Sequence, residues 1–427
     1  MTAVTDILKE LDWRGLIHQC TDRATLQELL KTSQVVYAGF DPTSDSLHVG
    51  SLLPLMMLRR FQKAGHRPIA VVGGATGMVG DPSGKSDERN LLSKEVLEAN
   101  VAGLEQQMRG FLDFDGPSGA KLVNNYDWTK GISFLDFLRD IGKNVPVNVM
   151  LTKDSVKSRL ERQDSGLSYT EFSYMLLQAF DFAYLAKTHQ CSLQIGGSDQ
   201  WGNITAGIDL GRRMHGKALY GLTCPLLLTS DGRKMGKTER GAVYLSASKT
   251  SPFAFYQYFV NVEDVDVMMV LRYLTEIEQE EILELEKATK EAPHERRAQK
   301  RLAESLTELV HGKAGLDAAK RATDTLFGAA IEDLNDAQLM DIFADVPSKT
   351  LQRQRLEEGL SIVDALVESE LAKSKGEGRR LVEGGGIYLN NRKIEGIDRV
   401  LSASDLASET VMVLRSGKRK YALLKFS

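Results

Sequence analysis

Two short stretches of the sequence carry residues suited to binding phosphate groups. The first, His48-Val-Gly-Ser51, opens an amphipathic helical pattern, and free N–H groups at a helix N-terminus favour an anion. Gly50 has no side chain, so a base or ribose could lie against its backbone. This interpretation puts Pro54 in the first turn of the helix, where proline is tolerated. The alternative is an ordinary strand–turn–helix with a capping histidine.

The second stretch, Lys234-Met-Gly-Lys-Thr238, follows a turn signal at Asp231-Gly232. Lysines on a glycine-spaced loop act as mobile point charges, which suit a polyphosphate whose charge moves during a reaction. Taken alone, this stretch slightly favours the alternative of a solvated basic loop. Taken together, the two stretches are a far more specific signal for phosphate binding than either is alone.

A third pattern predicts the binding of a second ligand. A capping box, Ser168-x-x-Glu171, starts a helix that places Tyr174, Gln178 and Asp181 on one face. A phenol, an amide and a carboxylate suit a zwitterionic aromatic amino acid, because its ammonium group needs acceptors and a substrate phenol needs a partner that donates and accepts. The alternative is a partly exposed polar face. Further polar contacts are expected from Gln194, Asp199 and Gln200 at the end of a strand.

These side chains require a scaffold that brings distant segments together. Over about the first 225 residues, short apolar runs alternate with helical patterns, which predicts an α/β fold with a parallel sheet. Each predicted strand runs into a glycine-containing turn, and ligands of open α/β sheets bind at those carboxyl ends. The strands are expected at Gln34–Phe40, Pro68–Gly73 and Ser192–Gly196.

The remainder of the chain changes character. Helical periodicity dominates residues 253–330, with one apolar face predicted over Arg297–Val310. A polar segment, Asp333–Gly359, is predicted to be a linker. The last residues, 360–427, are expected to form a small α+β unit in which Asn390-Asn391 makes the turn between two strands.

Composition limits the class of protein. The chain of 427 residues has a net charge of −4, although residues 361–427 hold 12 basic and 9 acidic residues, so the tail carries +3. A basic tail on an acidic body hints at a polyanionic partner. Three separated cysteines fit neither a disulfide framework nor a zinc site. No apolar run reaches the roughly 18 residues of a membrane span, so we expect a cytoplasmic protein without a membrane partner or bound protein metal.

The paired stretches resemble the two signatures of class I aminoacyl-tRNA synthetases, which bind ATP on a Rossmann-type domain. Two further runs, Gly73–Gly84 and Gln194–Asn203, closely resemble signatures of the bacterial tyrosyl-tRNA synthetases. With Tyr37–Thr43 and the Tyr174 helix, the resemblance covers nearly the whole chain. There are two departures: Ser51 stands where the family usually has a second histidine, and Gly236 stands where it often has serine, which loosens the loop.

The resemblance implies a role for individual residues. Tyr37 and Asp181 would bind the hydroxyl group of a substrate phenol, with Gln194 nearby. The ammonium group would be held by Asp81, Tyr174 and Gln178, and Gln200 would lie near the carboxylate. The nucleotide would be bound by Gly39, Asp41, Thr43, His48, Gly50, Ser51, Asp199, Lys237 and Thr238. Catalysis would rest on Thr43 and His48, with Lys85, Arg89, Lys234 and Lys237 at the departing pyrophosphate. RNA phosphates would meet Arg379, Arg380, Lys418, Arg419 and Lys420.

The family also implies an organisation and partners. The enzyme would activate L-tyrosine with Mg²⁺-ATP and then transfer the tyrosyl group to tRNA(Tyr). It would be a homodimer whose interface is formed by the region after the first half of its catalytic domain. The tail is similar to the S4-type RNA-binding fold. The implied domains are a Rossmann-type domain with an insertion over 1–225, a signature-loop linker over 226–252, an α-helical domain over 253–332, a linker over 333–359 and the S4-like domain over 360–427.

Three alternatives remain open on the sequence. A tryptophan enzyme is disfavoured by Tyr37 and Asp181, because an indole N–H needs only an acceptor. An RNA-binding scaffold without activity is suggested by Ser51 alone. A simple nucleotidyltransferase also uses a His-x-Gly site, although it would not need the basic tail.

Overall fold

The computed structural model describes residues 4–81, 92–152, 156–157, 168–239, 241–331, 334–417 and 420–427. They form two compact units. The first joins the residues up to Lys249 to Val262–Val310, and the second joins Thr250–Asn261 to His311–Ser427. This division differs from the expected separate helical domain over 253–332, because the helices of that region are shared between the two units.

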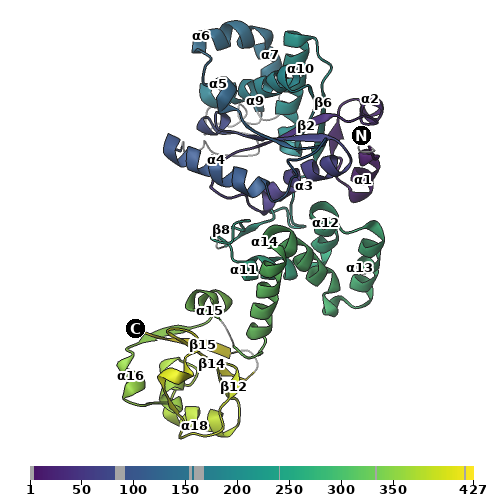
Figure 1. The fold of residues 1–427 in the computed structure, drawn as a ribbon. Helices are drawn as coiled ribbons and strands as arrows, with labels where there is room; N and C mark the ends of the chain where they lie inside the picture. Colours follow the sequence, from purple (N-terminus) through teal and green to yellow (C-terminus); the bar gives the residue numbers. More distant parts are fainter. Residues whose placement is uncertain are drawn as a thin grey trace. The chain divides into compact units, whose positions relative to one another are not determined.

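A six-stranded sheet forms the centre of the first unit (Figure 1). Its strands are parallel except β1, which pairs antiparallel with β6 at one edge. The inner strands β2 and β3 are buried along almost their whole length, which explains why they read as continuous apolar runs. In spatial order the strands are β1 (Gln19–Cys20), β6 (Tyr220–Cys224), β5 (Cys191–Gly197), β2 (Val35–Phe40), β3 (Arg67–Val72) and β4 (Lys121–Asn124).

Helices cover both faces of this sheet, with α3 (Val49–Lys63) and α4 (Lys94–Met108) on one face and α9 (Tyr169–Thr188) and α10 (Trp201–His215) on the other (Figure 1). The order of strands reverses between β2 and β5, and ligands of such sheets bind at this switch point. The predicted α/β class and its three strands are confirmed.

Further helices complete the first unit. In α14 (Arg297–Leu326) the predicted apolar face is confirmed, since Ala298, Leu302 and Leu306 are fully buried. Gly312 adopts a non-helical backbone with φ 70°, and the helix divides between the two units near this kink. The others are α1 (Ile7–Arg14), α2 (Arg23–Leu29), α5 (Tyr126–Thr129), α6 (Phe134–Asp136), α7 (Val147–Leu151), α12 (Asp264–Leu274) and α13 (Gln279–Glu291).

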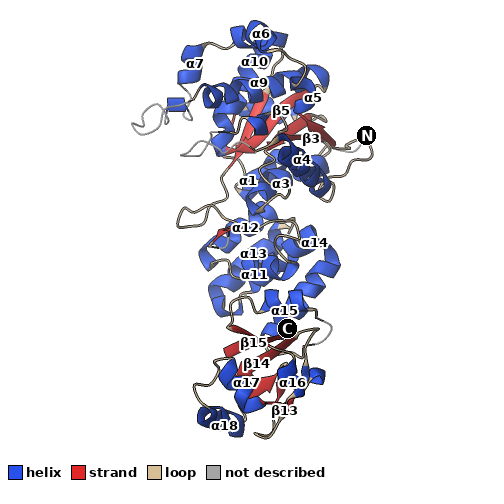
Figure 2. Ribbon diagram, turned by 90° about the vertical axis from the view of Figure 1, so that its left-hand side faces the viewer, coloured by secondary structure: helices blue, strands red, loops and turns tan. Residues whose placement is uncertain are grey.

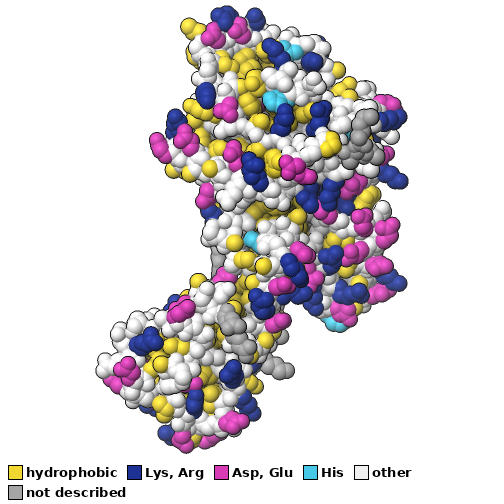
Figure 3. Space-filling view, in the orientation of Figure 1, with side chains coloured by type: hydrophobic (Ala, Val, Ile, Leu, Met, Phe, Trp, Pro, Cys, Tyr) yellow, Lys and Arg dark blue, Asp and Glu magenta, His cyan; other side chains and the backbone are white. Residues whose placement is uncertain are grey.

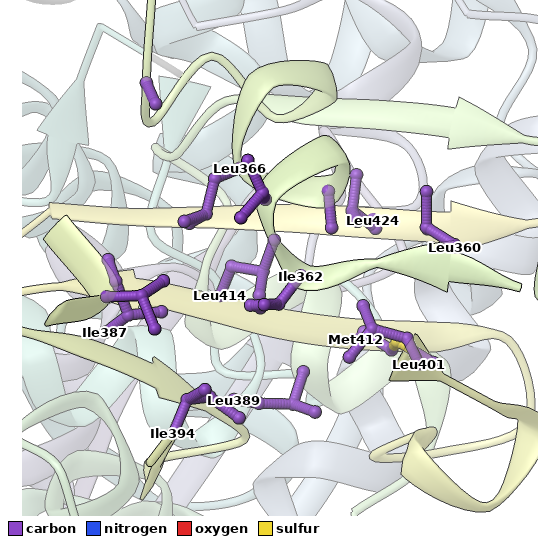
Figure 4. Packing of buried hydrophobic residues seen from close by; sticks show 14 of the residues in the cluster. Leu360, Ile362, Leu366, Ile387, Leu389, Ile394, Leu401, Met412, Leu414 and Leu424 are labelled. Atoms are coloured by element: carbon purple, nitrogen blue, oxygen red, sulfur yellow. The ribbon is translucent and has the colours of Figure 1, made fainter. Parts of the chain in front are cut away.

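The second unit is built on a five-stranded sheet (Figure 2). Ile362 and Leu366 of α17 (Ile362–Glu368) pack with Leu414 and Leu424 of the sheet to form its core (Figure 4). The strands are β12 (Arg392–Lys393), β11 (Ile387–Leu389), β14 (Val411–Ser416), β15 (Lys420–Phe426) and β9 (Ser348–Leu351), and the other helices are α11 (Pro252–Val260), α15 (Asp336–Ile342), α16 (Gln354–Glu357) and α18 (Lys375–Glu383).

Two expectations for this unit have different outcomes. The turn at Asn390-Asn391 is confirmed: both residues have positive φ, as a tight hairpin requires, and join β11 to β12. The expected linker over 333–359 is wrong. It contains α15, β9 and α16, and β9 pairs in parallel with β15 inside the sheet. The polar composition of the segment reflects its exposed strand, not an absence of structure.

Candidate active site

A cavity of about 500 Å³ lies in the first unit, where the signature stretches meet the strand ends. Sixteen of the residues predicted for the site line it: Tyr37, Gly39, Asp41, Thr43, His48, Gly50, Ser51, Asp81, Tyr174, Gln178, Asp181, Gln194, Asp199, Gln200, Lys234 and Lys237. Thr238 does not line it; its hydroxyl donates to the carbonyl oxygen of Gly241 (3.0 Å), where β7 (Lys237–Thr238) pairs with β8 (Gly241–Ala242). Lys85, Arg89, Lys418 and Arg419 lie outside the described residues.

One end of the cavity is a buried polar pocket around Asp181. Its carboxylate accepts hydrogen bonds from Asn125 Nδ2 (2.9 Å) and Trp128 Nε1 (2.8 Å). Asn125 is held in turn by the backbone N–H of Ala75 (2.7 Å) and by Thr76 Oγ1 (3.0 Å). The sequence analysis missed Asn125 and Trp128, which belong to no recognised motif. The polar pair Asn124-Asn125 at the end of β4 was the available signal, because strand ends of this sheet meet the site.

A hydroxyl group completes this pocket. Tyr37 is 1% exposed, and its ring packs on Phe182 with 5.2 Å between centroids. Within the part of the chain that the structure describes, neither Tyr37 Oη nor Gln194 Oε1 has a hydrogen-bond partner. Leaving a buried polar atom unpaired costs about 1–3 kcal/mol. A polar group of a ligand bound here would pair with Tyr37 Oη and Gln194 Oε1.

Burial controls the charge of the pocket. It raises the pKa of Asp181 to about 7; the N–H donors of Asn125 and Trp128 oppose this rise, and the charge of Asp41 adds to it. Burial, with the charge of Asp181 as the next cause, also raises the pKa of the Tyr37 hydroxyl well above its ordinary value. Tyr37 therefore stays neutral and can both donate and accept.

The raised pKa of Asp181 predicts a pH dependence of stability. The folded chain holds this proton up to about pH 7, whereas the unfolded chain releases it near 3.8. Between these values the folded state binds more protons, so the contribution of Asp181 to the free energy of unfolding decreases as pH rises. Asp181→Asn should flatten this dependence in urea titrations made across the window. Asp127→Asn, at an exposed carboxylate beside Trp128, should leave the slope unchanged, and equal slopes for wild type and Asp181→Asn would contradict the assignment.

A network of amides lies near Asp81. Gln200 Nε2 donates to Asp81 Oδ2 (2.8 Å), and Gln178 Nε2 donates to Gln200 Oε1 (3.2 Å). Asn203, which the sequence analysis missed, donates to Gln178 Oε1 (3.0 Å) and Gln200 Oε1 (3.1 Å). Tyr174 Oη lies 3.5 Å from Asp41 Oδ1. Acceptors for a cationic group therefore gather on this side of the cavity.

The first signature stretch begins α3, with His48 at the N-cap. The His48 ring covers Gly50: a Cβ on Gly50 would lie 2.9 Å from His48 Cε1. The side of Gly50 expected to receive a base or ribose is therefore occupied by the protein's own imidazole. The placement of Pro54 in the first turn is also wrong, because α3 starts at Val49 and Pro54 is its sixth residue. Proline has no N–H to donate to the carbonyl of Gly50 four residues earlier.

The second stretch packs directly on the first. Gly236 has φ +83°, and a Cβ there would lie 2.7 Å from Val49 Cβ. Val49 N–H donates to Val243 O (2.9 Å), and Val243 N–H donates to Gly236 O (2.7 Å). Gly236 therefore does more than loosen the loop, because a side chain at this position would be both strained and crowded.

Charge is concentrated where the two stretches meet. Burial raises the pKa of Asp199, the charge of Asp81 adds to this rise, and the charge of Lys234 opposes it. Lys234 and Lys237 both line the cavity. Two lysines beside helix α3 can bind a polyphosphate, and the Asp181 pocket can bind a polar aromatic group in the same cavity.

Comparison with known proteins identifies relatives. Residues 30–328 match the family model described as "tRNA synthetases class I (W and Y)", and residues 338–424 match a "Tyrosine--tRNA ligase SYY-like C-terminal domain". The chain is 61% identical to a tyrosine–tRNA ligase of Rhodopirellula baltica over 99% of its own length and 97% of the relative's. It is 52% identical to a tyrosine–tRNA ligase of Roseiflexus castenholzii, covering 99% and 100% of the two chains.

Two solved structures resemble this chain to different degrees. A C-terminally truncated mitochondrial tyrosyl-tRNA synthetase of Aspergillus nidulans superposes with a TM-score of 0.69 at 33% identity, covering 76% of this chain and 94% of that one. A tryptophanyl-tRNA synthetase of Encephalitozoon cuniculi shares the fold at 12% identity, with a TM-score of 0.54 over 73% of this chain and 87% of that one.

Proposed function

This chain belongs to the class I tRNA synthetases for tryptophan and tyrosine, and on that premise we propose that it acts as a tyrosine–tRNA ligase. It activates L-tyrosine with ATP to tyrosyl-adenylate and transfers the tyrosyl group to the 3′ end of tRNA(Tyr). The observation that carries the choice of amino acid is the buried Tyr37 hydroxyl beside Asp181, which has no hydrogen-bond partner among the described residues. A phenol that enters this pocket supplies the missing hydrogen-bond partner, whereas phenylalanine leaves it unpaired.

The geometry supports a mechanism of positioning and charge stabilisation. The tyrosine carboxylate attacks the α-phosphorus of Mg²⁺-ATP, a P–O bond forms, and the bond to pyrophosphate breaks. A carboxylate is already a nucleophile at neutral pH, so this step needs no general base. Thr43, His48, Lys234 and Lys237 all line the cavity, and in this mechanism they stabilise the charge that moves onto pyrophosphate. Asp81 and Tyr174 also line the cavity, and in this mechanism they hold the ammonium group of tyrosine.

ATP–pyrophosphate exchange tests this proposal directly. Exchange should depend on tyrosine and should be absent with tryptophan or phenylalanine as the only amino acid. Tryptophan-dependent exchange would indicate the related enzyme, and the absence of exchange with every amino acid would indicate a scaffold without activity. Exchange that is followed by charging of tRNA excludes a simple nucleotidyltransferase.

We also propose that the enzyme is a homodimer joined through α6 and α7. Large apolar side chains gather there in exposed positions: Phe134 is 64% exposed, Leu135 75% and Val147 58%. Such a cluster on a soluble protein marks an interaction site. The proposed occupant is a second copy of the chain, as the family resemblance implies.

A charge placed in this surface should break the dimer. Leu135→Glu should convert the protein to monomers in sedimentation velocity experiments, because a carboxylate would have to be buried in the interface. Val265, on α12, is 70% exposed outside this surface, so Val265→Glu is the matched control and should remain dimeric. A dimeric Leu135→Glu variant would place the interface elsewhere.

The C-terminal unit is proposed to bind tRNA. Arg379 and Arg380 are exposed on α18, and Lys420 is exposed at the start of β15. On the face shown in Figure 3, basic and acidic side chains are interspersed over this unit. None of the described helices combines the length and apolar character that a membrane span requires.

A further inference from the structure

We propose that Gln107 of α4 is a positioning residue for adenylate formation, because it fixes the segment that carries Thr43 and leads into His48. Gln107 does not line the cavity, so it would act through this segment and not on the substrate. The inference rests on the proposed function, since it assigns Gln107 to the same reaction.

One face of α4 contacts the segment at several points between Pro42 and Leu47. Asn100 Nδ2 donates to the carbonyl oxygen of Pro42 (2.9 Å). Gly103 brings the helix backbone against the chain, since a Cβ there would lie 2.2 Å from Asp45 O. Gln107 completes the support: its Oε1 accepts from Leu47 N–H (2.8 Å), and its Nε2 donates to Ser46 Oγ (3.0 Å). These three α4 residues lie at i, i+3 and i+7, a single helix face.

Ser46 connects Gln107 to the segment that follows the second signature stretch. It is 3% exposed, and its Oγ accepts from both Gln107 Nε2 and the N–H of Ser246 (3.1 Å). The Ser46 hydroxyl donates to Leu47 O (2.8 Å), which also accepts from the N–H of Leu245 (2.8 Å). These hydrogen bonds form a junction between the segment held by Gln107 and residues 245–246, which follow the Lys234–Thr238 stretch.

The junction extends at both ends. On the His48 side, Val49 N–H donates to Val243 O (2.9 Å). Toward Thr43, Lys249 Nζ donates to Ser44 Oγ (2.9 Å) and pairs with Asp45. The segment between Thr43 and His48 is thus fixed on one side by α4 and on the other by residues 243–249. Removing the amide of Gln107 leaves Leu47 N–H and Ser46 without one partner each.

Displacement of this segment should affect the reaction more than the binding of tyrosine. Thr43 and His48 act where charge develops on the phosphates, and a shift of about 1 Å in such groups can cost on the order of 100-fold in rate. The tyrosine pocket is built by other elements, since Asp181 comes from α9 and its partners Asn125 and Trp128 follow β4. A change in rate without a change in tyrosine affinity is therefore the expected signature.

The test uses three variants of the full chain. Gln107→Leu keeps approximate size and removes both hydrogen-bonding groups. Gln106→Leu is the matched control, because Gln106 is the neighbouring residue of α4 and is exposed. Gln107→Glu keeps an acceptor for Leu47 N–H and offers Ser46 an oxygen to which its hydroxyl can donate. Stopped-flow measurement of adenylate formation and equilibrium binding of tyrosine are made for each variant and for the wild type.

We expect the rate constant of adenylate formation to fall at least about tenfold in Gln107→Leu, with tyrosine affinity unchanged. Gln106→Leu should match the wild type, and Gln107→Glu should retain more of the rate than Gln107→Leu. Equal rates in Gln107→Leu and Gln106→Leu would overturn the inference while leaving the proposed function intact. A parallel loss of rate and tyrosine affinity would also overturn it. A wild type without tyrosine-dependent activity would overturn both.

Discussion

Replacing Lys237 with alanine should slow tyrosyl-adenylate formation by roughly 100- to 1,000-fold while leaving tyrosine affinity unchanged. Lys237 lines the cavity at the start of β7, and the loop that carries it is joined to the His48 stretch through Gly236 and Val243. A lysine in this place stabilises charge that reaches the pyrophosphate only as the P–O bond breaks. Its loss therefore raises the barrier to the reaction and does not weaken the complex with tyrosine.

A neighbour in the same loop provides the control for this prediction. Arg233 carries the same charge, its side chain is 81% exposed and paired with Asp231, and it does not line the cavity. Arg233→Ala should form adenylate at nearly the wild-type rate in stopped-flow experiments. If Lys237→Ala also reacts at the wild-type rate, Lys237 has no part in the step. If both variants are equally slow, the loop acts only through its overall charge.

Much of this site could be predicted because it is made of local patterns that recur at strand ends. The spacing of Tyr174, Gln178 and Asp181 fixes them to one helix face, whatever the rest of the fold does. The two signature stretches follow apolar runs, and the strand ends of a parallel sheet bring such turns together. The resemblance to the paired class I signatures assigned His48 and Lys234, almost two hundred positions apart, to one site, and both residues line the same cavity.

The groups that the sequence did not predict depend on contacts across the chain. Asn125 and Trp128 reach Asp181 only after β4 has joined the sheet, and no periodicity marks a residue that binds another side chain more than fifty positions away. Asn203 belongs to a recognised run, but its role is to donate to two glutamine oxygens, which only the packed α9 and α10 bring within reach.

Backbone conformation was the second feature that could not be predicted from the sequence. A glycine in a loop suggests flexibility, yet Gly236 has a positive φ in close contact with Val49. Polarity over 333–359 suggested a linker, yet β9 gains its hydrogen bonds from β15, more than seventy residues away. A strand at a sheet edge needs little apolar character, so the composition of the segment could not reveal it.

Reversing the charge of the two arginines on α18 should separate the two halves of the reaction. Arg379→Glu combined with Arg380→Glu should lower kcat/KM for tRNA charging by about 100-fold at low salt, because two phosphate contacts become repulsive. Tyrosine-dependent pyrophosphate exchange should be unchanged, since neither residue lines the cavity. The core of the C-terminal unit should also be preserved, because both side chains are exposed on their helix.

Salt dependence distinguishes phosphate binding from a general effect of charge. Each lost contact with duplex phosphate reduces the slope of log affinity against log salt by about 0.9, so the double variant should bind tRNA with a slope smaller by roughly two. Lys287 and Lys290 of α13 have side chains about three-quarters exposed, and the pair Lys287→Glu and Lys290→Glu makes the same change in net charge at another place. This control should keep the wild-type slope if binding depends on the arginines of α18. An equal loss of charging in both double variants would instead show that net charge alone governs the encounter with tRNA, because neither pair would then mark a specific contact.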